Sequence, residues 1–295
     1  MLELYLSRDE RKHHSFDAKN LKLALQALRE DGFVILHDVI AYKHIESLRE
    51  RMLSDVADIL ALDDVPLQFN DGHLQQDPPP FPPYLFRDIL VNDFVVQITR
   101  AALGEGVKNT MYSGNTCLPN ETQQPLHVDH GQLWPGLKTA TPAFSIVTNV
   151  PVVDMTPENG STEIWPGTHL DTTRSHDDKN IKIAPEDEER RRAEVEPLQP
   201  NVPAGGVIIR DMRLWHRGMP NYTNTPRPMI AMVHFVHWWH TNKSLLFPIG
   251  TESLFEGSPL KTTTKFVEGP INYISRNKKY DYGKAGGPEP LNGES

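Results

Sequence analysis

The sequence of 295 residues contains one cysteine, no apolar run near the roughly 20 residues that span a bilayer, and no excess of positive charge. The lone Cys117 cannot form an internal disulfide, so nothing in the chain requires an oxidising compartment. The residues after Met1 lack the apolar core of a secretory signal. A net charge of −9 disfavours nucleic acid as a partner, because phosphates select basic surfaces. We therefore expect a soluble, cytoplasmic protein that binds neither a membrane nor nucleic acid.

Two hydrolase motifs are missing as well. The chain has no Gly-x-Ser-x-Gly sequence, which places the nucleophile of many serine hydrolases. It also has no His-Glu-x-x-His sequence, which holds zinc in many metalloproteases. Both absences disfavour these two enzyme classes.

Proline, by contrast, is abundant, with 25 residues, and 38% of the chain is hydrophobic. Because proline interrupts helices and central strands, we expect long loops around one sizeable core. We interpret residues 1–285 as a single domain and the polar, glycine-rich residues 286–295 as a disordered tail. In the N-terminal part, 1–105, the apolar spacing predicts a short strand and three helices. The strand covers 33–36, and the helices lie near 21–28, 41–62 and 93–103.

From about residue 107 the apolar pattern changes from helical to strand-like. Candidate strands, separated by turn residues, are 108–117, 143–153, 161–165, 206–210 and 228–239. Many short strands with turn-rich links indicate a jelly roll or barrel, with its core over about 106–245. The charged segment 171–203 interrupts the strands, and we interpret it as a surface insertion. It is either a solvated helix or a lid over a site.

One short segment combines residue types that bind metals. His127 and Asp129 are two residues apart, so in an extended strand both side chains point to the same face. A third ligand must come from elsewhere, and His216, which follows the predicted strand 206–210, is the best candidate. Two histidines and one carboxylate leave three positions open on an octahedral ion, as in non-haem iron(II) oxygenases. Taken alone the His-x-Asp pair is weak evidence, because the chain holds 13 histidines and 39 acidic residues.

A single arginine strengthens this interpretation. Arg227 follows His216 beyond the turn-forming residues 220–226, so a returning strand would place it deep in the core near the metal. A buried guanidinium needs an anionic partner, and its planar fork suits the distal carboxylate of 2-oxoglutarate. The alternative is that Arg227 caps a loop or forms a surface ion pair.

Four motifs together resemble the phytanoyl-CoA dioxygenase family of iron(II) and 2-oxoglutarate oxygenases. The motifs are Gln124-Pro-Leu-His127-Val-Asp129-His130, Asn159-Gly160-Ser161-Thr162-Glu163-Ile164-Trp165-Pro166-Gly167-Thr168-His169, Trp215-His216-Arg217-Gly218 and Arg227. Their order and spacing over about 30–240 are similar to the family's. The resemblance implies a mainly β fold, a cupin-like double-stranded β-helix (jelly roll) with flanking N-terminal helices.

The resemblance also implies a site and a reaction. His127, Asp129 and His216 would hold iron(II), and Arg227 would hold 2-oxoglutarate, with dioxygen as second co-substrate and succinate and carbon dioxide as products. Asp129 stands where halogenating relatives carry a small residue, so a halide ligand is not expected. Gln124 falls where relatives often place a polar co-substrate contact. Thr162 is a further co-substrate contact if it points inward from its strand.

Several assignments stay open at this stage. Trp134 and Trp165 are candidates for lining the substrate mouth, although core packing explains large aromatic residues equally well. We expect a small-molecule substrate from specialised metabolism, and hydroxylation, desaturation or rearrangement all fit. The alternatives are an acyl-CoA hydroxylase of lipid catabolism and a cupin-type metal enzyme that does not use 2-oxoglutarate. A homodimer is compatible with the sequence, which does not decide the oligomeric state.

Overall fold

The structure is a computed structural model that describes residues 1–178 and 180–279. Its helices are α1 (Arg8–His13), α2 (Ala18–Glu30), α3 (Tyr42–Leu60), α4 (Arg87–Leu90), α5 (Asp93–Leu103) and α6 (Pro185–Glu194), with 3₁₀ turns η1 (Thr168–Leu170) and η2 (Glu252–Leu254). The strands are β1 (Glu3–Tyr5), β2 (Phe33–His37), β3 (His73–Gln75), β4 (Lys108–Cys117), β5 (Ser145–Pro151), β6 (Glu163–Ile164), β7 (Val207–Asp211), β8 (His216–Arg217), β9 (Arg227–Phe235), β10 (Leu245–Pro248), β11 (Lys261–Thr262) and β12 (Thr264–Val267). No helix within the described residues is long and apolar enough to cross a bilayer.

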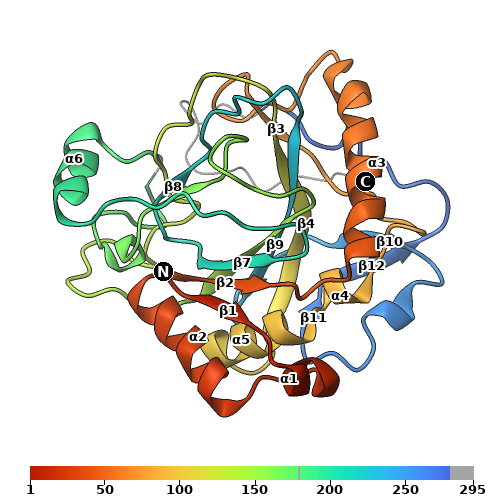
Figure 1. Ribbon diagram of the computed structural model, residues 1–295, viewed down its shortest axis with the longest axis horizontal. Coiled ribbons are helices and arrows are strands. Elements are labelled where there is room, and N and C mark those ends of the chain that lie inside the picture. Colours follow the sequence, from red (N-terminus) through yellow and green to blue (C-terminus); the bar gives the residue numbers. More distant parts are fainter. Residues whose placement is uncertain (179, 280–295) are drawn as a thin grey trace.

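An eight-stranded sheet forms the first layer of the core. Its order is β1-β2-β7-β5-β9-β4-β11, and β3 pairs with β4 (Figure 1). The central pairs are antiparallel, whereas β1–β2 and β11–β4 are parallel. Side chains alternate between the two faces of each strand. The outer face, which includes Ile209, Ile230 and Met232, packs with apolar residues of α2, α3 and α5 in the largest hydrophobic cluster.

Short segments form the second layer, which faces the inner side of the main sheet. β6 pairs with β8, and single bridges continue this pairing through Lys182–His127–His216–Ile164–Leu198. Apolar residues from both layers fill part of the space between them, including Ile208 and Met229 from the main sheet and Ile164 from β6. Two facing layers of antiparallel strands are the arrangement of a jelly roll.

Polar side chains cap the starts of α2 and α5. Asp17 accepts a hydrogen bond from the backbone N–H of Asn20 at the start of α2, and Asn92 accepts from the N–H groups of Phe94 and Val95 at the start of α5. Such caps satisfy N–H groups that have no partner inside the helix. The predicted limits of the helix over 93–103 and of the strand over 108–117 agree with α5 and β4.

The predicted mainly β class needs a correction, because the molecule is mixed α/β. Helices from the N-terminal third cover the outer face of the main sheet, and the sheet itself includes β1, β2 and β3 from that part of the chain. After residue 245 the chain adds β11 beside β4. The predicted tail 286–295 lies outside the described residues.

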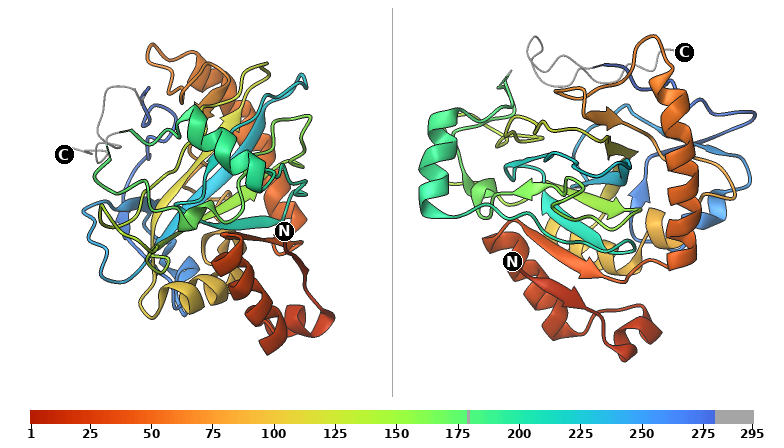
Figure 2. Two further views of the ribbon diagram at one scale, coloured as in Figure 1. Left: turned by 90° about the vertical axis from the view of Figure 1, so that its left-hand side faces the viewer. Right: turned by 45° about the horizontal axis from the view of Figure 1, so that its top comes forward.

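The charged insertion contains one exposed helix. α6 has no buried residue and stands at the margin of the molecule, away from α3 (Figures 1 and 2). The insertion nevertheless contacts the second layer before this helix begins. Val128 donates to the carbonyl of Ile181, and Ile183 donates to the carbonyl of Leu126. The insertion therefore runs as an extra strand beside the segment that carries His127 and Asp129.

Candidate active site

The three predicted metal ligands meet between the two layers. One ligand atom from each of His127, Asp129 and His216 lies within 4.8 Å of the other two. His127 and His216 exchange both backbone hydrogen bonds, which sets their side chains next to each other. Their ring centroids are 4.4 Å apart, and Nε2 of His216 is 3.6 Å from Oδ2 of Asp129. The fold thus assembles a compact group of two imidazoles and one carboxylate.

Both histidines are oriented as metal ligands. Nδ1 of His127 donates to the carbonyl of Pro125 at 2.8 Å, and Nδ1 of His216 donates to the carbonyl of Leu214 at 3.0 Å. These bonds fix the tautomer and leave Nε2 with a free lone pair. Burial lowers the pKa of His127, and it lowers the pKa of His216 to about 3, with Arg210 adding to the effect. Both imidazoles are therefore neutral at pH 7, which is the form that binds a cation.

Arg210 on β7 holds the carboxylate ligand. Its NH2 lies 2.7 Å from Oδ2 of Asp129, and its Nε donates to Oδ1 of Asn149 at 3.2 Å. Burial opposes ionisation of Asp129, but the guanidinium of Arg210 and the neighbouring histidines hold the pKa of this carboxyl well below its usual range. The donor set of two neutral imidazoles and one ionised carboxylate fits a divalent iron ion. The sequence contained a signal for this contact, because Arg210 ends the buried apolar run 207–209.

Arg227 is buried at the start of β9, as its position after the turn predicts. Its NH2 donates to the carbonyl of Gly160 at 2.6 Å, and its Nε contacts the carbonyl of Asn159 at 3.4 Å. Its NH1 is buried, and no hydrogen-bond partner for it exists among the described residues. Burial lowers the pKa of Arg227, since no carboxylate offsets the loss of hydration. The guanidinium thus has an unused donor where a carboxylate would complete its coordination.

Two residues of the segment before β4, Phe69 and His73, also lie at this site, and no motif or spacing in the sequence identifies them. The ring of Phe69, whose backbone φ is +64°, lies 4.5 Å from the ring of His127. Burial, assisted by Arg227 and then His127, lowers the pKa of His73 to about 3. A Cβ atom on Gly218 would stand 2.3 Å from Nε2 of His73, so this approach requires glycine. His73 therefore packs against Gly218, two residues after the ligand His216.

The remaining predicted residues have different surroundings. Oε1 of Gln124 accepts a hydrogen bond from the N–H of Gly218 at 2.8 Å, which ties Gln124 to β8. Thr162 is partly exposed just before β6. Trp134 is 59% exposed, whereas Trp165 is 1% exposed and packs in a small apolar cluster with Trp215. The roles proposed for Gln124, Thr162 and Trp134 stay predictions, and the buried Trp165 has the surroundings of a packing residue.

An ion-pair cluster joins α6 to the strands around the triad. Arg217, the neighbour of His216, lies 2.8 Å from Glu163 and 3.0 Å from Glu188 of α6. Arg192 of the same helix pairs with Glu188 and lies over the ring of Trp165, 4.7 Å from its centroid. The exposed helix is therefore attached to the metal-bearing layer through the ion pair between its partly exposed Glu188 and the buried Arg217.

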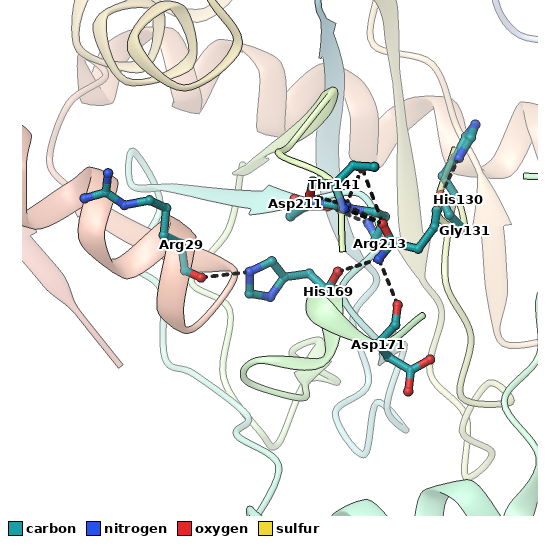
Figure 3. A network of polar contacts seen from close by, with 9 residues as sticks. Arg29, His130, Gly131, Thr141, His169, Asp171, Asp211 and Arg213 are labelled. Carbon is teal, nitrogen blue, oxygen red and sulfur yellow. Dashed lines mark hydrogen bonds and ion pairs between the residues drawn. The ribbon is translucent and has the colours of Figure 1, made fainter. Parts of the chain in front are cut away.

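A second polar network supports the segment that carries His127 and Asp129. Arg213 forms a two-point ion pair with Asp211, and its NH1 donates to Oε1 of Gln132 at 2.7 Å. Figure 3 shows Arg213 between Asp211 and Thr141, with His169 reaching toward the carbonyl of Arg29 on α2. Since Gln132 follows Asp129 closely, this network fixes the segment 129–132 against β7.

Comparisons with known proteins agree with this geometry. The model of the family described as phytanoyl-CoA dioxygenase (PhyH) matches residues 28–229. The chain is 25% identical over 150 residues to the dioxygenase af480 of Aspergillus fumigatus, which covers 51% of this chain but only 44% of that relative. EctD from S. alaskensis in its apo form matches with a TM-score of 0.54 and 19% identity, covering 75% of this chain and 77% of EctD.

A second solved structure supports the same fold. The non-haem α-ketoglutarate-dependent carbocyclase SnoK from nogalamycin biosynthesis matches with a TM-score of 0.54 and 16% identity, covering 84% of this chain and 94% of SnoK. The family match, in turn, spans more than half of the sequence. The chain therefore belongs to the phytanoyl-CoA dioxygenase family of iron(II)- and 2-oxoglutarate-dependent dioxygenases.

Proposed function

We propose that this protein hydroxylates, desaturates or rearranges a small organic substrate, with iron(II) held by His127, Asp129 and His216. 2-Oxoglutarate would be anchored by Arg227, and dioxygen would be the second co-substrate. The observation that carries the proposal is the triad, whose two Nε2 lone pairs and one ionised carboxylate converge. The unused NH1 of the buried Arg227 supports the assignment of the co-substrate anchor.

Each group of this chain would have a defined task. When bound, iron(II) with 2-oxoglutarate supplies the oxidising chemistry, and succinate and carbon dioxide leave as co-products. Arg227 would donate from its unused NH1 to the distal carboxylate and so fix the co-substrate's orientation. Arg210 would keep Asp129 ionised and pointed at the metal. Phe69 would exclude water from the open side of His127.

The first alternative is an acyl-CoA hydroxylase, which would need cations for the phosphates of coenzyme A. Three arginines cluster near His216 in the sequence, but each pairs with a carboxylate of the protein. Arg210 pairs with Asp129, Arg213 with Asp211, and Arg217 with two glutamates. These arginines therefore do not form a phosphate-binding patch. The description of SnoK as a biosynthetic enzyme favours a specialised metabolite instead.

The second alternative is a metal enzyme of this fold that does not use 2-oxoglutarate. Two experiments distinguish this alternative from the proposed function. The first is anaerobic titration of 2-oxoglutarate into the iron(II)-loaded protein, and the second is a screen for succinate release. Arg227→Ala should raise the required 2-oxoglutarate concentration at least about tenfold, because a charged hydrogen bond is lost. Arg100→Ala is the matched control, since Arg100 forms an exposed pair with Glu105. An unchanged requirement in Arg227→Ala would remove Arg227 from the co-substrate site, whereas turnover of the unchanged protein without succinate release would remove 2-oxoglutarate from the proposal.

A further inference from the structure

The inner wall of the main sheet changes character along β9. At one end stands Arg227, the proposed co-substrate anchor. Towards the other end the inner positions Val233 and Phe235 join Val147 of β5 in a separate buried apolar cluster. Trp239, which follows β9, packs against this cluster. The barrel thus has a polar end at Arg227 and an apolar end at Phe235.

Arg210 lies at the boundary of the apolar end. It pairs across the sheet with Val147, which pairs in turn with Val233. Arg210 is 6% exposed, with NH2 on Asp129 and Nε on Asn149. Its NH1 is buried without a hydrogen-bond partner in the described part of the chain. A buried donor without a partner costs free energy, so a ligand oxygen would stabilise it.

Flat rings close the apolar end. Phe235 and Trp239 are stacked with centroids 4.9 Å apart and planes 13° from parallel. His130, next to the ligand Asp129, stacks on His176 of the insertion at 4.6 Å and 4°. Trp239 contacts both of these histidine rings edge-on. Segments from the main sheet, the metal-bearing layer and the insertion therefore contribute aromatic faces to one place.

We propose that this end of the barrel binds the substrate, and that the substrate is a planar, largely apolar ring carrying a carboxylate or carbonyl oxygen. The ring would lie against Val147 and Val233, beside the stacked pair of Phe235 and Trp239. Its oxygen would accept a hydrogen bond from NH1 of Arg210, which places the neighbouring carbons beside the metal. This inference rests on the proposed function, because it assumes that iron(II) and 2-oxoglutarate occupy the rest of the site.

The test uses three probes of known structure on the full-length protein loaded with iron(II) and 2-oxoglutarate under anaerobic conditions. The probes are 1-naphthoate, 1-methylnaphthalene and octanoate, which separate the effects of the planar ring and of the carboxylate. 2-Oxoglutarate bound to iron(II) gives a charge-transfer absorbance, and a probe beside the metal perturbs it. We expect 1-naphthoate to bind at least about tenfold more tightly than either of the other probes.

Variants locate the binding site. Trp239→Ala should weaken 1-naphthoate binding about tenfold, while Trp239→Phe should retain most of it because a flat ring remains. Trp238→Ala is the matched control, since Trp238 adjoins Trp239 in the chain and is 53% exposed. The 2-oxoglutarate affinity of all three variants should stay unchanged. Thermal unfolding checks that each variant is folded, and the Phe variant keeps the test valid if the Ala variant is not.

The possible failures differ in what they overturn. If 2-oxoglutarate produces no charge-transfer absorbance, the proposed function fails, and this inference fails with it. If the absorbance forms but 1-naphthoate leaves it unchanged, only the substrate inference is overturned. Equal binding of 1-methylnaphthalene would remove the role of Arg210, and equal binding of octanoate would remove the requirement for a planar ring. If Trp238→Ala weakened 1-naphthoate binding as much as Trp239→Ala does, the probe would not bind at the proposed site.

Discussion

The attachment of α6 to the metal-bearing layer leads to a quantitative prediction. Arg217 is 5% exposed and pairs with Glu163 and Glu188. Arg217→Ala removes the cation between two carboxylates, one of which is buried, so we expect a loss of about 3–5 kcal/mol in the free energy of unfolding. Glu188→Gln leaves Arg217 paired with Glu163, and Glu188 is partly exposed. We therefore expect a loss of only about 1 kcal/mol.

Two measurements check this prediction. Urea unfolding gives the change in free energy, and amide hydrogen exchange over 181–194 reports the opening of the insertion alone. Exchange there should accelerate in Glu188→Gln, while the rest of the protein stays protected. Asp187→Asn is the matched control, because the ion pair that Asp187 forms within residues 1–178 and 180–279 is with exposed Arg190 on the same helix. If Arg217→Ala loses less than about 1 kcal/mol, or if exchange is the same in both helix variants, α6 is a solvated helix with no attachment to the site.

Three further outcomes follow from buried groups and from the metal. Burial lowers the pKa of His234 to about 3, so the unfolded chain binds an extra proton below pH 6.5; stability should fall by about 2 kcal/mol from pH 7 to 5 through this residue. Urea unfolding at both pH values should show His234→Gln without this loss. Gly160 has φ +79°, and a Cβ atom there would lie 2.6 Å from the carbonyl of Met219, so Gly160→Ala should lower the free energy of unfolding by about 2 kcal/mol or more. Because the carbonyl of Gly160 accepts from Arg227, the variant should also need more 2-oxoglutarate for succinate release. Gly104→Ala is the control, because Gly104 has φ +88° but no atom within 4 Å of a new Cβ, so its loss of stability reports the strained backbone alone. Iron(II) at one hundred times its Kd should stabilise the chelator-treated protein by about 2.7 kcal/mol in thermal unfolding, and Asp129→Ala should abolish the gain.

The elements that the sequence predicts well are those with many repeats of one period. α3 and α5 show several helical turns of apolar residues, and the predicted strand over 108–117 agrees with β4. β1, β3 and β11 contain two or three residues each and are strands only because they pair with distant segments. No local pattern of so few residues identifies such a pairing partner.

The same distinction applies to the site. The two-residue spacing of His127 and Asp129 predicted that their side chains converge, and they do, although the structure gives this segment only isolated bridges at His127 and a bend at Asp129. The pairing of Arg210 with Asp129 and the position of His73 near Arg227 depend on how two layers and one loop meet. Trp134 and Trp165 were indistinguishable by residue type, yet one is exposed and the other buried. The difference arises because Trp165 packs in the cluster with Ile183 and Trp215, and Arg192 of α6 adds a contact over its ring.

The charges between the two layers connect the co-substrate and substrate proposals. The ionised Asp129 pairs with Arg210, Arg227 is a second buried cation, and each cation has an NH1 without a partner among the described residues. A divalent metal would increase this positive excess, because the histidine ligands are neutral. The 2-oxoglutarate dianion would offset most of the excess and leave about one positive charge uncompensated at low effective dielectric. A substrate with one carboxylate at Arg210 would neutralise it, so a singly charged acid should bind more tightly than its amide.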